Sequence, residues 1–184
     1  MTPRRFDPAA SDRLEDPERF RYLSRDELVG ALDPDPTDII VDLGTGTGFY
    51  TREVAPFVGR IFALDLQPQM LADFESSGIP PNVIPAVAKG SAIPVGRGDL
   101  DGAISTMTYH EFDDRAVGEL ARGIKSDGRL VIADWSALGS GERGPPLDDR
   151  NDPQDAANSI ESGGFDVLRV ASRPESFLVV ADRL

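Results

Sequence analysis

The stretch "IIVDLGTGTGFYTREVAPF", residues 39–57, decides how the rest of the sequence is interpreted. Its apolar run ending in an acid is typical of a buried strand. Gly44, Gly46 and Gly48 follow at every second position, and apolar residues then recur at helix-like intervals over residues 47–57. A strand, a bare backbone turn and a helix in this order predict a ligand-binding turn at the carboxyl end of the strand. A tight structural turn without a ligand is the alternative.

The remainder of the chain repeats this alternation. Strands are expected at residues 38–43, 60–66, 82–88, 100–107, 128–135, 165–171 and 175–182, with helices at residues 24–32, 47–57, 67–77, 113–124 and 152–164. Apolar strands separated by helices indicate a parallel sheet covered on both faces. We therefore expect an α/β fold: a Rossmann-like, doubly wound, seven-stranded, mostly parallel sheet that closes with a C-terminal antiparallel hairpin. Residues 24–184 are expected to form a single domain, preceded by an N-terminal arm of residues 1–23.

The overall charge limits the class of partner. The 184 residues carry 32 acids against 19 bases, a net charge of −13. Such a surface repels phosphate backbones, so no nucleic-acid partner is expected. An acid-rich chain with only two lysines also favours a high-salt cytosol, with an acidic mesophilic protein as the alternative.

The residue inventory limits the chemistry further. The chain has no cysteine and one histidine, His110, so we expect no disulfide, thiolate or metal site. The first 20 residues lack the apolar segment of a signal peptide, and no apolar run is long enough to span a membrane. A cytoplasmic location is the resulting expectation; the oligomeric state is not predicted.

The spacing of the glycines distinguishes between the known types of glycine-rich turn that bind ligands. A dinucleotide fingerprint, G-x-G-x-x-G, requires a glycine where the chain has Phe49, and a phosphate loop requires a Gly-Lys-Ser/Thr that does not occur. "VDLGTGTG" instead resembles D/E-x-G-x-G-x-G, the first motif of the class I S-adenosylmethionine-dependent methyltransferases. Asp42 and the three glycines match its four positions.

The resemblance extends over about residues 24–184, and its closing part is similar to small ubiquinone/menaquinone-type, methyltransferase type 11-like members of the family. "KGSAIPV" stands where the family has G-D-A-x-x-L-P-F, with Ser91 replacing the acid that accepts from the adenine amino group. "DGAISTMTYHEFDD" resembles the fourth strand and the segment after it, where two histidines are frequent; here they are His110 and Glu111.

S-adenosylmethionine is the cofactor that this resemblance implies. The glycines would accommodate its methionine tail, and Asp42 would receive the ammonium group or merely order the turn. Asp65, at the end of the second strand, would accept from the ribose hydroxyls, as in NAD enzymes. Leu66 and Met70 would flank the adenine or belong to the core. The full set of expected cofactor-binding residues is Asp42, Leu43, Gly44, Thr45, Gly46, Thr47, Gly48, Tyr50, Asp65, Leu66, Met70, Gly90, Ser91, Ala92, Thr106 and Met107.

The expected catalytic residues are Tyr109, His110 and Glu111. Methyl transfer needs a base only when the acceptor carries a proton that must leave, and an imidazole titrates near neutrality. Glu111 would orient or assist His110, and the alternative is a histidine that only packs against the cofactor. Tyr109 and Trp135 would line an aromatic acceptor pocket, although Trp135 is equally consistent with a core position.

Two further segments are candidates for the site. Arg143 and Arg150, in the loop after the fifth strand, would hold an acidic acceptor or be solvated charges, with Arg150 paired to a nearby acid. The N-terminal arm, including Phe20 and Tyr22, would fold over the cofactor as a lid or fray.

The preferred hypothesis is a methyltransferase that acts on a small-molecule acceptor by in-line transfer. An NAD(P)-binding oxidoreductase and a non-catalytic S-adenosylmethionine-binding module are the alternatives.

Overall fold

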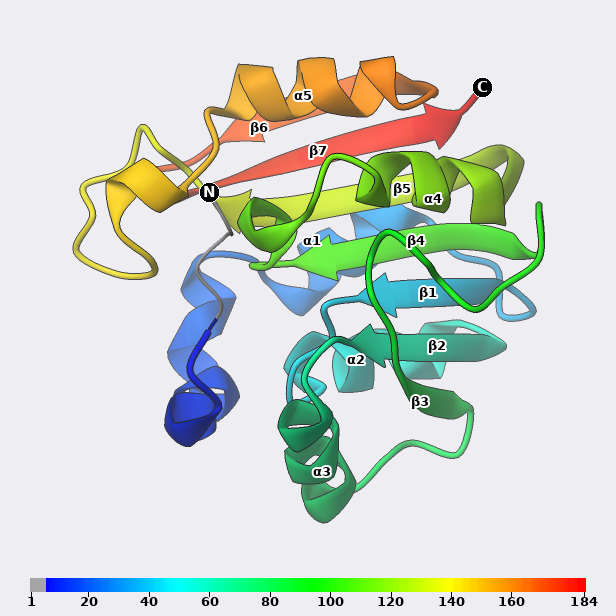
Figure 1. The fold of residues 1–184 in the computed structure, drawn as a ribbon, viewed down its shortest axis with the longest axis horizontal. Helices are drawn as coiled ribbons and strands as arrows, with labels where there is room; N and C mark the ends of the chain where they lie inside the picture. Colours follow the sequence, from blue (N-terminus) through cyan, green and yellow to red (C-terminus); the bar gives the residue numbers. More distant parts are fainter. Residues whose placement is uncertain (1–5) are drawn as a thin grey trace.

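The computed structural model describes residues 6–184, and its strands form one mixed sheet of seven (Figure 1). The strand order is β3-β2-β1-β4-β5-β7-β6. The four pairings from β3 to β5 are parallel, and β7 runs antiparallel to both β5 and β6. The expected fold class is therefore confirmed, including the C-terminal hairpin. The strands are β1 (Ile39–Leu43), β2 (Arg60–Asp65), β3 (Val83–Val87), β4 (Leu100–Thr106), β5 (Ile124–Trp135), β6 (Phe165–Ser172) and β7 (Ser176–Arg183).

Helices cover both faces of the sheet. Apolar side chains of α1, α2 and α3 pack with one buried cluster, whereas those of α4 and α5 pack with the other. Alternate residues of β5 supply the two clusters: Val131 and Ala133 belong to the first, Leu130 and Ile132 to the second. The α-helices are α1 (Arg25–Leu32), α2 (Phe49–Val54), α3 (Pro68–Ser77), α4 (Ala116–Gly123) and α5 (Pro153–Ser162).

Short 3₁₀ segments occupy the connections and the N-terminal arm. They are η1 (Pro8–Glu15), η2 (Pro17–Arg21), η3 (Ala55–Phe57), η4 (Tyr109–Glu111) and η5 (Leu147–Asp149). The helix expected over residues 47–57 is divided into α2 and η3, because Pro56 removes a backbone donor from its last turn. The start of α1 is as expected, since the Ser24 hydroxyl accepts from the Glu27 N–H at 3.2 Å.

The fifth strand is longer than its sequence indicates. The Asp127-Gly128 turn lies inside β5 rather than before it, with Asp127 at a φ of +63°. It accompanies a shift of the β4–β5 register between Leu100 and Gly102. The irregularity lies far from the carboxyl ends of the strands, where β1, β4 and β5 bring their last residues together.

Candidate active site

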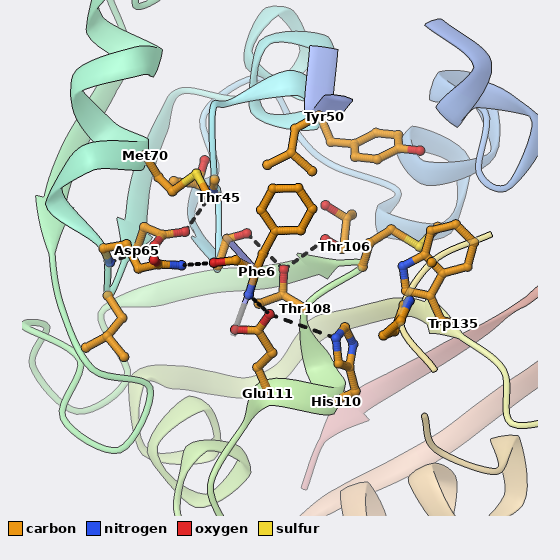
Figure 2. Close-up of a pocket in the computed structure, with 18 of the residues that line it drawn as sticks. Phe6, Thr45, Tyr50, Asp65, Met70, Thr106, Thr108, His110, Glu111 and Trp135 are labelled. Atoms are coloured by element: carbon orange, nitrogen blue, oxygen red, sulfur yellow. Dashed lines mark hydrogen bonds and ion pairs between the residues drawn. The ribbon is translucent and has the colours of Figure 1, made fainter. Parts of the chain in front are cut away.

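A cavity of about 730 Å³ lies at the carboxyl ends of β1, β2, β4 and β5, beneath the N-terminal arm. Figure 2 shows side chains that line it. This is the position at which doubly wound sheets bind ligands, and the volume suits a drug-sized molecule. The point of strand-order reversal is between β1 and β4, since the chain moves outward from β1 through β2 to β3 and then returns to β4.

The glycine loop after β1 forms one wall, and its glycines serve different purposes. A Cβ at Gly44 would lie 2.4 Å from the Thr108 side chain, and one at Gly48 would lie 2.3 Å from the Phe74 ring. These two glycines are therefore required by the packing of the loop itself. A Cβ at Gly46 would meet only Leu14 of the arm, at 3.5 Å, which is an ordinary contact distance. The packing of the loop therefore leaves space beside Gly46, on the side that faces the arm.

Asp65 connects the second strand to the glycine loop. One carboxylate oxygen accepts the Gly46 N–H and the other the Gln67 N–H, both at 2.8 Å. Burial raises the pKa of Asp65, and the backbone hydrogen bonds oppose that rise. The carboxylate still lines the cavity, where its remaining lone pairs can accept from a ligand hydroxyl.

The structure brings most of the expected cofactor-binding residues to this cavity. Those that line it are Leu43, Gly44, Thr45, Gly46, Tyr50, Asp65, Leu66, Met70, Gly90, Thr106 and Met107. Those that do not line it are Asp42, Thr47, Gly48, Ser91 and Ala92.

Asp42 lies beneath the glycine loop and does not line the cavity, where a contact with the ammonium group, directly or through water, was one expectation. Its carboxylate is buried and accepts the Thr51 hydroxyl at 2.5 Å, and the Thr45 and Thr51 hydroxyls are 2.5 Å apart. Its Oδ1 has no hydrogen-bond partner within residues 6–184. Burial raises the pKa of Asp42 to about 6, against the two threonine hydrogen bonds. Asp42 therefore orders the turn, the alternative that its sequence position left open.

Two other expected residues contact protein groups instead of the cavity. The Thr47 hydroxyl donates to Glu15 of the arm. Ser91 hydrogen-bonds Asp113, whose carboxylate lines the cavity and also lies 3.1 Å from the Lys89 ammonium. A carboxylate is thus present at this wall, but it comes from the segment before α4. Nothing in its sequence position marked Asp113.

His110 is held by Asp134, a residue that the sequence analysis missed. The backbone N–H of His110 donates to Asp134 Oδ2 at 2.6 Å, and ring Nδ1 lies 3.0 Å from both carboxylate oxygens. Asp134 is fully buried at the end of β5. The carboxylate favours the tautomer with a proton on Nδ1, which leaves Nε2 as an acceptor. The sequence did carry a signal for Asp134. This acid lies next to the end of the apolar strand β5, which pairs with β4, the strand that precedes His110.

Glu111 stands on the other side of the His110 ring (Figure 2). Its Oε1 is 3.9 Å from His110 Nε2. Burial opposes a charge on the histidine, but Asp134 and then Glu111 outweigh it and raise the pKa of His110. Both residues line the cavity.

Tyr109 is a correction to the expected catalytic set. Its ring is buried in the cluster under α4 and α5 and packs on Phe112 at 5.3 Å. Burial raises its pKa, opposed by a hydrogen bond with Ser159 of α5. Tyr109 does not line the cavity, so we assign it to the core.

The arm forms the wall opposite the sheet. The Phe6 N–H donates to Glu111 at 3.0 Å, and its carbonyl accepts from the Gln67 side chain at 3.2 Å. Its ring lies centrally in the cavity (Figure 2). Glu15 also binds Arg52 of α2. The arm thus contacts the segments after β1, β2 and β4, contacts that no periodicity in its sequence revealed.

The loop after β5, residues 136–152, borders the cavity at the end near β5. Trp135 lines the cavity and packs on Tyr22 of the arm at 4.8 Å between ring centroids. Arg150 is buried: it pairs with Glu175 at 3.1 Å and donates to the carbonyls of residues 136, 143 and 145. Arg150 is therefore the paired arginine that the sequence allowed, and it orders the loop. Arg143 lines the cavity and lies 3.7 Å from Glu18.

Within residues 6–184, no three His, Asp or Glu side chains are grouped so that they could hold a metal ion. None of the helices described is long and apolar enough to cross a membrane.

The cavity residues fit S-adenosylmethionine, the cofactor that the sequence resemblance implies. The open face of Gly46 and the backbone around it leave room for an amino-acid tail, while the Asp65 carboxylate can accept from a ribose. Leu66 and Met70 border the same wall and offer apolar surface to an adenine.

Comparison with known proteins gives the family. The sequence profile of the methyltransferase domain family matches residues 41–132, half of the chain. A demethylmenaquinone methyltransferase of Corynebacterium kroppenstedtii is 32% identical over 107 residues, 57% of this chain and 45% of that protein. An uncharacterized methyltransferase of Mycobacterium tuberculosis is 29% identical over 120 residues, 65% of this chain and 48% of that protein. The matches span less than half the length of these relatives.

Solved structures agree with this assignment. An S-adenosylmethionine-dependent methyltransferase from Aquifex aeolicus superposes with a TM-score of 0.87 at 25% identity, covering 98% of this chain and all of that one. A Haloferax volcanii methyltransferase, solved with the Trm112 methyltransferase activator, gives a TM-score of 0.77 at 18% identity, covering 95% and 94%, and supports the fold alone. The chain therefore belongs to the methyltransferase domain family of class I S-adenosylmethionine-dependent methyltransferases, and S-adenosylmethionine is its cofactor.

Proposed function

We propose that the chain transfers a methyl group from S-adenosylmethionine to a small-molecule acceptor whose attacking atom must lose a proton, such as a phenol or hydroquinone. The observation that carries the proposal is the pair of His110 and Asp134. A buried carboxylate that fixes a cavity-lining imidazole from behind is the arrangement that orients a general base.

The division of work among the residues follows from their positions. S-adenosylmethionine supplies, when bound, a methyl group on a sulfonium leaving group. His110 Nε2 takes the acceptor's proton, and Asp134 stabilises the resulting imidazolium through Nδ1–H. Glu111 adds a second negative charge at 3.9 Å from Nε2. The chain otherwise has to align the acceptor and exclude water, because the sulfonium is already an excellent leaving group.

The surroundings favour an aromatic acceptor. Tyr22 and Trp135 offer two aromatic rings, tilted against one another, at the cavity wall, and Pro145 and Pro146 extend this apolar surface. The demethylmenaquinone methyltransferase relative is named for a quinone-type acceptor, which agrees with this choice. The net charge of −13 weighs against a nucleic-acid acceptor.

Three further expectations belong to the same proposal. The arm of residues 1–23, of which residues 1–5 lie outside the described part of the chain, acts as a lid. The contacts of Phe6 and Glu15 with the segments around the cavity support this role. The chain works in the cytoplasm. Its acid-rich, lysine-poor composition is an adaptation to high salt, where self-repulsion is screened.

The experiment is a transfer assay with labelled S-adenosylmethionine in high potassium chloride, using phenols and hydroquinones beside their O-methylated counterparts. We expect label only in acceptors with an ionisable hydroxyl. His110→Ala should lower turnover by roughly 10²–10⁴-fold, the usual contribution of a general base, with cofactor binding retained. Unchanged turnover by His110→Ala with every accepted substrate would refute the base role.

A further inference from the structure

Arg19, in η2 of the arm, places a guanidinium against the helix that follows the glycine loop. Its Cζ lies 4.8 Å from the centroid of the Phe49 ring and 4.9 Å from that of the Tyr50 ring. The Tyr50 hydroxyl in turn donates to the Arg19 carbonyl at 3.0 Å. Both Arg19 and Tyr50 line the large cavity. The cation is therefore fixed beside the first residues after Gly48 and turned toward the same space as the loop.

The charge of Arg19 has no direct counter-ion. Within residues 6–184, no carboxylate oxygen lies within 4 Å of its guanidinium, and the hydrogen bond recorded for it goes to the Leu14 carbonyl at 2.5 Å. The nearby acids are committed elsewhere: Glu15 binds Thr47 and Arg52, and Asp42 accepts from Thr51 beneath the loop.

Burial opposes the charge of Arg19, and the contacts with the Phe49 and Tyr50 rings offset part of this effect. Burial lowers the pKa of Arg19, and the charges of Glu15 and Asp42 compensate only in part. An arginine offers five N–H donors in a planar fork, and the recorded hydrogen bond uses one of them. A partly buried fork with free donors fits a carboxylate or phosphate, which it can bind in a bidentate manner.

The position of Arg19 in the cavity indicates which anion it binds. Asp65 contacts the loop at Gly46 and suits ribose hydroxyls, so the adenosine belongs at the end of the cavity near β2. Arg19 lies over the residues that follow the last glycine of the loop. The methionine tail of the cofactor carries the one carboxylate of the molecule, and the glycine loop is the wall that accommodates the tail.

We propose that Arg19 binds the α-carboxylate of S-adenosylmethionine, so that the arm supplies part of the cofactor site. The proposal deepens the proposed function, because it depends on the cofactor but not on the acceptor. Folding the arm over the loop and binding the cofactor would then be one event. Phosphate-bearing cofactors are disfavoured at this position, because the loop lacks their glycine spacing.

The test compares ligands that differ by the carboxylate alone. Binding of S-adenosylmethionine and of decarboxylated S-adenosylmethionine is measured by calorimetry, with no acceptor present, for the wild type, Arg19→Met and Arg19→Lys. Arg21→Met is the matched control, since Arg21 is an exposed residue of the same short helix and does not line the cavity. Thermal unfolding of each free variant checks that it is folded.

The wild type is expected to prefer the carboxylate-bearing ligand by roughly 10- to 100-fold, the range of a charge-assisted hydrogen bond. Arg19→Met should lose most of this preference through weaker binding of S-adenosylmethionine, while its affinity for the decarboxylated ligand stays within about threefold. Arg19→Lys should keep part of the preference, and Arg21→Met all of it.

Three results would overturn the proposal: a preference retained by Arg19→Met, an equal loss for both ligands, or a wild type that binds both equally. If Arg19→Met does not fold, Arg19→Lys decides alone, and an undiminished preference in that variant would refute the contact. A wild type that binds neither ligand would contradict the cofactor itself, and hence the proposed function.

Discussion

Asp134 holds His110 at two points, accepting its backbone N–H at 2.6 Å and lying 3.0 Å from its ring Nδ1. His110 lies in η4, just after β4, and Asp134 lies near the end of the adjacent parallel strand β5. The carboxylate thus fixes both the position of the backbone and the orientation of the ring. Its complete burial keeps this interaction strong, because little solvent screens it.

The pH dependence of methyl transfer follows from the raised pKa of His110. A base must be neutral to accept a proton, and a raised pKa means that the neutral form prevails only at higher pH. We therefore expect kcat/KM, which reports the free enzyme, to rise with pH through an inflection above the ordinary histidine value of about 6.5. A pH profile with an acidic-limb inflection below that value, or with no such limb, would contradict this assignment.

Asp134→Asn tests whether the carboxylate positions the base. Removal of the negative charge leaves burial as the larger influence on His110, so the inflection should move to lower pH. Turnover at the plateau should fall by roughly tenfold or more, because a misoriented base forfeits part of the usual 10²–10⁴-fold contribution. A purely structural role would lower activity at every pH alike and leave the inflection in place.

The anchoring of the arm predicts a kinetic effect of Glu15. Glu15→Ala removes the contacts with Thr47 and Arg52. If the arm is a lid, S-adenosylhomocysteine should dissociate several-fold faster, and a protease should cleave the free arm more readily. Asp12→Ala is the control, because Asp12 is an exposed residue of the same arm segment and does not line the cavity. Equal dissociation rates for the wild type and Glu15→Ala would mean that the arm does not gate the cavity.

The buried Asp42 predicts an unusual dependence of stability on pH. Its pKa is about 6 in the folded chain against 3.8 when unfolded, so between these values the folded state holds a proton that the unfolded state has released. Its contribution to the unfolding free energy must therefore decrease as pH rises from 4 to 6, by about 3 kcal/mol at 1.36 kcal/mol per unit.

Asp42→Asn removes this titration and keeps the shape of the side chain. The stability of the variant relative to the wild type should therefore fall by about 3 kcal/mol when the pH is lowered from 7 to 4. Denaturant unfolding at several pH values measures the difference. A difference independent of pH would show that folding does not change the pKa of Asp42. An opposite slope would show that folding lowers this pKa instead.

The fold was predictable because its signals are local and periodic. Apolar strands such as residues 39–43 and a glycine turn after the first of them specify a doubly wound sheet, and the sheet has the expected strands. The boundaries were less predictable where one residue opposes the pattern, as Pro56 does at the end of α2 and Asp127 inside β5.

The site was only partly predictable, because several of its contacts join residues far apart in the sequence. Sequence motifs identified His110 and the glycine loop. Asp134, which orients His110, lies 24 residues further along the chain and belongs to no motif. The position of Asp42 could not be decided, since an acid after a buried strand can face the ligand or the turn. Tyr109, next to His110 in the chain, lies on the opposite side of η4 and is buried in the core.

The central claim is that the cavity binds S-adenosylmethionine, and ligand-dependent unfolding tests it most directly. In high potassium chloride, S-adenosylhomocysteine at about a hundred times its dissociation constant should add roughly 2.7 kcal/mol and raise the midpoint by about 5–10 °C, whereas NADH should have no effect. Asp65→Ala should weaken this shift at the same ligand concentration. A shift with NADH and none with S-adenosylhomocysteine would contradict the account.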